Sequence, residues 1–124
     1  VVGAHLSGMP LNAELRAAGA TLLRTVRTRP DYRLFALPGT PAKPGLLRVG
    51  DGAGEAIEVE VWSLDPAAFG RFVAAIPAPL GVGRLRLDDD TTPAGFLVEA
   101  AATAAAEDIT TFGGWRRYVA ANGG

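Results

Sequence analysis

The chain has 124 residues, of which 48% are hydrophobic and 20% are charged, and its formal net charge is −1. These values are typical of a single globular domain, here residues 1–124, that buries a core without cross-links. The near-zero charge argues against nucleic acid or an anionic membrane surface as a partner. Because the chain has no cysteine and one histidine, we expect no disulfide framework and no metal site, and no motif indicates a cofactor.

No apolar segment is long enough to span a bilayer, and no secretory signal is visible at the start. The chain begins on an apolar segment without an initiator methionine, which suggests a trimmed chain or a domain excised from a longer protein. A cytoplasmic location is the resulting expectation.

The N-terminal part predicts one short helix among several strands. In chain order we expect a strand over 1–4, a loop over 6–10, a helix over 13–18, strands over 21–28 and 32–37, a rigid loop over 38–45 and a strand over 46–49. Asn12 is a suitable N-cap for the helix, although residues 11–20 also fit a loose helical turn. Three prolines and two glycines make the loop at 38–45 rigid.

The C-terminal part predicts two helices and a hairpin. In chain order we expect a turn over 50–54, a strand over 56–62, a helix from Pro66 to Pro77, strands over 82–87 and 95–100, and a terminal helix with Phe112, Trp115, Tyr118 and Val119. The turn at 50–54 indicates a hairpin between its flanking strands. Asp65 is the predicted N-cap of the helix that begins at Pro66. Strands and helices do not alternate regularly, so we expect an α+β fold with a mixed, partly closed, β-barrel-like sheet and flanking helices.

His5 is the first candidate for chemistry, because no other side chain here has an ordinary pKa near neutrality. It follows Gly3, which lets a strand end turn sharply. Polar side chains in loops after strands often form sites. An equally simple interpretation is a histidine that bonds a backbone carbonyl and has no further role.

The acidic residues suggest two weaker candidates. Glu58 and Glu60 share one face of a strand, as an acid–base pair would, but such a pair is more often the polar face of a half-buried strand. The three consecutive carboxylates of Asp88–Asp90 lack the spacing of a calcium loop, so a solvated turn is expected there.

The basic residues suggest one anion-binding position. Arg24, Arg27, Arg29 and Arg33 form a cluster that we expect to be solvated. Lys43 and Arg48 are better placed to bind a carboxylate, because they lie beside the rigid loop. Composition and spacing alone therefore predict an α+β domain with a site near its first loop.

Four segments in family order resemble the C-terminal domain of allophanate hydrolase, in the gamma-glutamyl cyclotransferase-like fold group. They are VVGAHLSGMPLN, YRLFALPGTPAKPGLLRV, IEVEVWSLDPAAFGRFVAAIPAPLGVGRLRL and FGGWRRYVA, and they cover nearly the whole chain. The resemblance implies the fold of that group and a role in urea degradation.

The resemblance also implies a pocket. In the fold group a Tyr-Gly-x-Asn-Leu loop holds a substrate carboxylate through backbone amides. Here that loop reads Val2-Gly3-Ala4-His5-Leu6, so the glycine and leucine match and the tyrosine and asparagine do not. A second wall would be Lys43-Pro44-Gly45. Leu80 stands where the cyclotransferases have their acid–base glutamate, which argues against cyclotransferase activity.

The chemistry that the resemblance implies is decarboxylation of N-carboxycarbamate, which an amidase domain or subunit forms from allophanate. The amides of Gly3, Ala4 and Leu6 would hold one carboxylate of this small dicarboxylate-like substrate. Lys43 or Arg48 would neutralise the other, with Gly45 lining the pocket, and His5 would donate a hydrogen bond or a proton.

A rival hypothesis remains open, namely a non-catalytic assembly or stabilising module, or a free-standing relative that only binds a small carboxylate. A homodimer through an exposed Trp115 or a strand edge is also compatible with the sequence.

Overall fold

Within residues 1–122, which the computed structural model describes, seven strands pair into three small antiparallel sheets. The elements are α1 (Asn12–Ala17), β1 (Thr21–Arg27), β2 (Tyr32–Leu37), β3 (Lys43–Arg48), β4 (Glu58–Ser63), α2 (Pro66–Ala74), β5 (Leu80–Arg84), β6 (Ala94–Val98), η1 (Ala100–Thr103), β7 (Glu107–Asp108), η2 (Thr110–Phe112) and α3 (Trp115–Ala121). The α+β class is confirmed by this arrangement.

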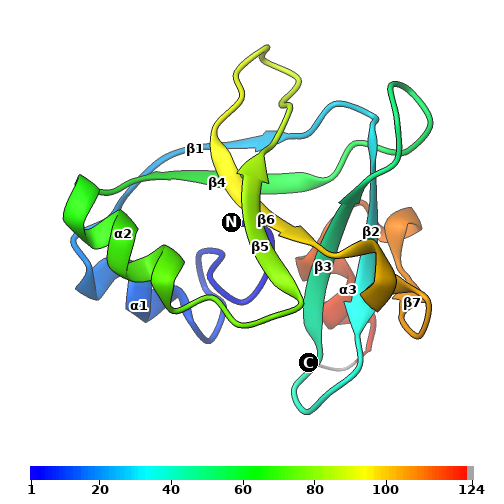
Figure 1. Cartoon of the computed structure of the whole chain (residues 1–124), viewed down its shortest axis with the longest axis horizontal. Helices are drawn as coiled ribbons and strands as arrows, with labels where there is room; N and C mark the ends of the chain where they lie inside the picture. Colours follow the sequence, from blue (N-terminus) through cyan, green and yellow to red (C-terminus); the bar gives the residue numbers. More distant parts are fainter. Residues whose placement is uncertain (123–124) are drawn as a thin grey trace.

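The strand orders are β1-β4, β3-β2-β7 and β5-β6. β2, β3 and β7 gather at one end of the molecule, while α1 and α2 lie at the other (Figure 1). Every one of these strand pairs is antiparallel, so the predicted mixed sheet is wrong. Among the residues described, the strands form no closed barrel.

Several predicted elements are confirmed almost residue for residue. β2 has the predicted bounds, and β1 ends one residue earlier than expected. The Asp65 carboxylate caps α2 by accepting a hydrogen bond of 2.8 Å from the Ala68 amide. The β5–β6 hairpin also forms, although both strands lie earlier in the chain than predicted.

The predicted strand over residues 1–4 is wrong, because this segment forms a coil followed by turns. The Val1 carbonyl does accept a 3.0 Å hydrogen bond from the Glu60 amide of β4. The ladder stops there, since the chain turns at Gly3, whose carbonyl accepts from the Leu6 amide at 2.9 Å. Asn12 is likewise the first helical residue of α1, and its predicted role as N-cap is wrong.

The predicted hairpin across residues 50–54 is also wrong. β3 pairs with β2 and β4 pairs with β1. β3 begins at Lys43, inside the segment predicted to be a rigid loop, so residues 43–45 pair with the end of β2. The turn instead carries the chain across Tyr32, where a Cβ on Gly54 would lie 2.4 Å from the Tyr32 carbonyl oxygen. That close approach suits only glycine.

The core contains Tyr32, Leu34, Ile57 and Trp115, each at most 5% exposed. The buried Tyr32 hydroxyl accepts a hydrogen bond of 2.9 Å from the Arg86 amide, so its polar end is satisfied. Because Trp115 is buried, the idea of a dimer through an exposed Trp115 is wrong.

Most of the arginine cluster is paired rather than freely solvated. Arg24 bonds Asp89 at 2.8 Å, and Arg33 bonds Asp108 at 2.6 Å. Arg29 reaches Asp90 of the turn at 3.5 Å, so the Asp88–Asp90 turn serves partly as a counter-charge.

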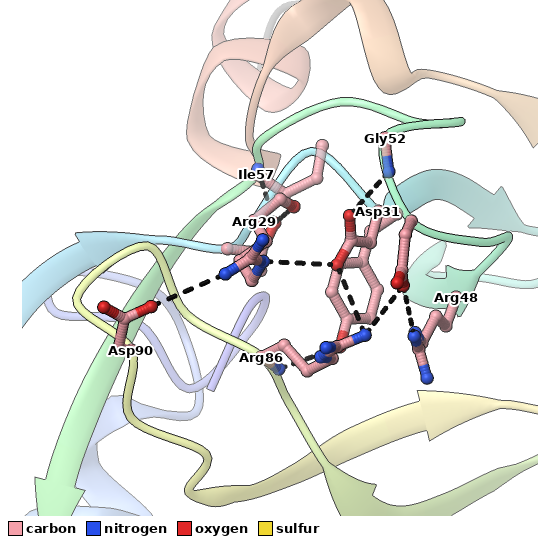
Figure 2. A network of polar contacts seen from close by, with 10 residues as sticks. Arg29, Asp31, Arg48, Gly52, Ile57, Arg86 and Asp90 are labelled. Carbon is pink, nitrogen blue, oxygen red and sulfur yellow. Dashed lines mark hydrogen bonds and ion pairs between the residues drawn. The ribbon is translucent and has the colours of Figure 1, made fainter.

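Asp31 lies at the centre of a second polar group, between Arg29 and Arg86 (Figure 2). Its side chain is almost fully buried, and its Oδ1 accepts a 2.9 Å hydrogen bond from the Gly52 amide. Its Oδ2 has no hydrogen-bond partner among the described residues and lies 3.7 Å from Arg29 Nε and 4.0 Å from Arg86 Nη1.

No helix in residues 1–122 is long and apolar enough to cross a membrane. Within the same residues, no group of three or more histidine, cysteine, aspartate or glutamate side chains is arranged to hold a metal ion.

Candidate functional site

A cavity of about 570 Å³ lies against the loop that carries His5. Its walls come from the N-terminal loop, the start of β3, the end of α2, β6 and α3. The walls are mainly apolar and include Met9, Phe72, Ile76, Leu80, Phe96 and Trp115. The charged side chains among the described lining residues are those of Glu14 and Lys43, beside the titratable His5 and Tyr118. A concave, mainly apolar site with a few polar groups is the usual form of a small-molecule site.

The His5 imidazole is held between a carboxylate and two aromatic rings. Its Nε2 lies 3.0 Å from Glu14 Oε1, and its side chain is 17% exposed. The ring meets the Phe72 ring edge-on at a centroid distance of 4.9 Å, and the Phe96 ring at 6.1 Å. Because Glu14 Oε1 is a hydrogen-bond acceptor, this contact favours a hydrogen on Nε2 of the imidazole.

The backbone on either side of His5 is fixed by hydrogen bonds. The His5 carbonyl accepts from the buried Asn12 side chain at 2.9 Å, and the Ala4 carbonyl accepts from the Leu11 amide at 2.8 Å. In the described structure the Gly3 and Ala4 amides donate to no protein acceptor. Both residues line the cavity.

Gly3 packs directly against the start of β3. A Cβ built on Gly3 would lie 2.0 Å from Cγ of Pro44, closer than any real contact allows. The absence of a side chain at Gly3 therefore lets the His5 loop and β3 meet at the cavity wall.

The structure brings together only some of the residues predicted for the site. Gly3, Ala4, His5 and Lys43 line the cavity, whereas Leu6, Gly45 and Arg48 are not among its lining residues. Leu80, which the resemblance predicts at the position of the cyclotransferase glutamate, also lines it.

Each of the three absent residues has a structural explanation. The Leu6 side chain is fully buried in the core, and its amide already donates to Gly3. Gly45 lies inside β3, against Leu37 and Val98. Arg48 lies at the other end of β3, about 17 Å along the strand from Lys43, and bonds Asp51 at 2.6 Å.

Sequence reasoning missed Glu14 and Asn12 as neighbours of His5. Both lie on α1, whose first turn packs against the His5 loop. The available signal was their spacing from His5, nine residues for Glu14 and seven for Asn12, but spacing across a loop does not determine contact.

Glu58 and Glu60, predicted as an acid–base pair or a polar strand face, both accept from Arg116. Arg116 Nη1 lies 3.0 Å from Glu58 Oε1, and Nη2 lies 2.8 Å from Glu60 Oε2. Burial alone would raise the pKa of Glu60, but hydrogen bonds from Arg116, the Ser7 amide and Trp62 outweigh it and lower that pKa. The hydrogen bond to Glu60 raises the pKa of Arg116, against the opposing effect of burial.

Phe72 and Phe96 stack at 5.5 Å and separate this cavity from a second hollow of about 300 Å³. Leu23, Phe69 and Val82, all at least 40% exposed, line that second hollow. His5, Glu14 and Lys43 all belong to the larger cavity.

Comparison with known proteins gives consistent matches. The urea amidolyase of Saccharomyces cerevisiae is 44% identical over 122 residues, which are 95% of this chain and 7% of the yeast protein. The solved Kluyveromyces lactis allophanate hydrolase matches with a TM-score of 0.92 and 41% identity, over 98% of this chain and 20% of that one. A crystal structure of a protein specific to uropathogenic E. coli matches with a TM-score of 0.86 and 34% identity, over 96% of this chain and 91% of that one.

The chain thus spans about 7% of the length of the curated relatives it matches, but most of the uropathogenic E. coli protein. A family model described as the allophanate hydrolase C-terminal domain matches residues 1–120. The chain belongs to the allophanate hydrolase C-terminal domain family.

Proposed function

We propose that the chain binds a small carboxylate in the His5 cavity and supports decarboxylation of N-carboxycarbamate in urea degradation. The observation that carries this proposal is that His5, Lys43, Gly3 and Ala4 line one cavity, and that the Gly3 and Ala4 amides have no acceptor among residues 1–122. Family membership supports the same chemistry, because the matched relatives are urea amidolyases and allophanate hydrolases.

The reaction needs three things from the protein. As carbon dioxide leaves N-carboxycarbamate, the C–N bond breaks, its electron pair stays on nitrogen, and that nitrogen takes a proton to give carbamate. The Gly3 and Ala4 amides hold the carboxylate that remains, and Lys43 offsets the second negative charge. His5 donates the proton, and Glu14 orients its imidazole.

One observation favours the non-catalytic alternative. Lys43 is the only cationic side chain among the described residues lining the cavity, apart from any charge on His5. A dianion is better neutralised by two cations, and Arg48 lies too far away to be the second. A binding or assembly module would hold a carboxylate here without turning it over.

Replacement of His5 by Asn tests catalysis directly. Asparagine keeps a hydrogen-bond donor but carries no transferable proton, so we expect carbon dioxide release to fall about 100-fold or more. The rate is measured with N-carboxycarbamate generated in place by an allophanate-deaminating amidase, with and without the chain. An unchanged rate in His5→Asn, together with intact binding of malonate as an unreactive dicarboxylate, would establish the binding module instead.

Lys43 and Arg48 provide a matched pair for the binding site. Loss of a charge-assisted contact in Lys43→Met should raise the dissociation constant for malonate about tenfold. Arg48→Met should leave it unchanged, because Arg48 lies outside the cavity. Isothermal titration calorimetry measures both, and equal losses in the two variants would refute this placement of the carboxylate.

The same proposal includes the wider expectations drawn from the sequence. These are an amidase domain or subunit that supplies the substrate, the gamma-glutamyl cyclotransferase-like arrangement of the pocket, a cytoplasmic location, and a homodimer through a strand edge.

A further inference from the structure

Ser7 lies two residues after His5 and is hydrogen-bonded to Glu60 and Arg116, which are distant from it in the sequence. The Ser7 amide donates to Glu60 Oε1 at 2.7 Å, and its hydroxyl donates to the same oxygen at 3.2 Å. The Ser7 carbonyl accepts from Arg116 Nη2 at 2.6 Å. Both polar groups of the Ser7 backbone are therefore bound by side chains from β4 and α3.

Glu60 and Arg116 also fix each other. Glu60 is 3% exposed, and its carboxylate accepts from Arg116 at 2.8 Å and from the Trp62 indole at 3.1 Å. Arg116 is further held by Glu58 at 3.0 Å. A buried carboxylate and an arginine that share this many hydrogen bonds have few alternative positions.

The imidazole itself is held less firmly than its backbone. In the part of the chain that the structure describes, the ring makes one hydrogen bond, to Glu14, whose side chain is 59% exposed, and exposed pairs of this kind contribute little. The position of the ring therefore depends on the loop, which Asn12 fixes at the His5 carbonyl and which Glu60 and Arg116 fix at Ser7.

We propose that Glu60 and Arg116 are positioning residues. Through their hydrogen bonds with Ser7 they determine the position of the His5 imidazole in the cavity. Neither residue needs to touch the substrate for this role. The predicted effect of these residues on turnover rests on the proposed function. Their predicted effect on the position of the His5 ring does not.

The test uses His5 as its own probe, because it is the only histidine and its imidazole resonances are unambiguous in the untagged chain. The ring lies 4.9 Å from Phe72, edge-on, so the chemical shifts of its carbon-bound protons report its distance from that ring. In Arg116→Met the Ser7 carbonyl loses its donor. We expect these protons to move away from their wild-type shifts, and carbon dioxide release to fall about 100-fold, as for a reacting group displaced by about 1 Å.

Arg117→Met is the matched control, since Arg117 is the next residue and is exposed, and its side chain makes one hydrogen bond within residues 1–122, of 3.4 Å to the Phe112 carbonyl. Its His5 shifts and its rate should equal those of the wild type. If folded Arg116→Met retains the wild-type His5 shifts, the positioning role is overturned.

Two further results keep the inference separate from folding and from the proposed function. If Arg116→Met does not fold, Arg116→Lys and Glu60→Gln take its place, and we expect smaller His5 shift changes in each, whereas unchanged shifts in both would overturn the proposal. If the wild type neither binds malonate nor speeds decarboxylation, the proposed function fails, while the His5 shifts still decide the positioning role.

Discussion

Glu60 and Asp31 are two carboxylates buried to the same degree, one at 3% and the other at 1% exposure, and both lie near arginines. Glu60 accepts hydrogen bonds from the Ser7 amide and hydroxyl, Trp62 and Arg116. Among the described residues, Asp31 accepts one hydrogen bond, from Gly52, and its other oxygen lies 3.7 and 4.0 Å from two arginine nitrogens (Figure 2).

The difference shows that burial beside a positive charge has two outcomes. A buried carboxylate with short hydrogen bonds to both oxygens keeps its charge and holds its donors in place. A carboxylate with one unbonded oxygen gains only longer-range attraction, and the desolvation of that oxygen is poorly compensated. We therefore expect Glu60 to contribute more to stability than Asp31.

The largest effect is expected for Glu60→Ala, which leaves the Arg116 guanidinium and the Ser7 amide without their buried acceptor. Because this acceptor serves the Ser7 amide and hydroxyl, the Trp62 indole and Arg116, its loss should cost about 3 kcal/mol of unfolding free energy. Urea unfolding measures the loss. Glu58→Ala, which removes the more exposed partner of the same arginine, is the control. An equal loss of stability in that variant would contradict the larger contribution expected from Glu60.

A smaller effect is expected from pH. The pKa of Glu60 is lowered in the folded chain from its ordinary value of 4.5, so the unfolded chain takes up the proton first as pH falls. The stability that this carboxylate contributes is fully present above about pH 4.5 and is lost as pH falls through the lowered value. The gap in unfolding free energy between wild type and Glu60→Gln, measured with urea, should shrink from about pH 7 to about pH 3. A gap that stays constant or widens would contradict this assignment.

The smallest effect is expected for Asp31→Asn, at about 1 kcal/mol. The amide oxygen can keep the Gly52 hydrogen bond, and the change removes only the longer contacts to Arg29 and Arg86. Glu60→Gln at neutral pH, the equivalent substitution, should cost about 2 kcal/mol, because it removes a 2.8 Å bond to Arg116. Urea unfolding of the two variants decides the order, and a larger loss for Asp31→Asn would reverse the comparison.

Local patterns in the sequence predicted most elements of this fold. β2 and α2 were found because alternation and an Asp-Pro helix start are encoded in neighbouring residues. The pairing of β3 with β2, and of β4 with β1, was missed because the turn signal at residues 50–54 fits a hairpin equally well. Nothing in that signal shows that the turn must cross Tyr32.

The residues around the cavity were predicted only in part. The family resemblance identified the loop of Gly3, Ala4 and His5, all of which line the cavity. Its fixation at Ser7 was not predictable, since Glu60 lies 53 residues away and Arg116 lies 109 residues away. Contacts of that separation are set by tertiary packing, which local periodicity does not report.

The contact between Gly3 and Pro44 has a consequence for how sequences of this family can diverge. A side chain at position 3 would occupy the space of the Pro44 ring, so it can be introduced only together with a smaller residue at position 44. The two positions should therefore covary among homologues. To reshape the cavity by engineering, these two positions are better kept and changes made at Ile76, in the connection between α2 and β5, or at Leu80, at the start of β5, both of which line the cavity.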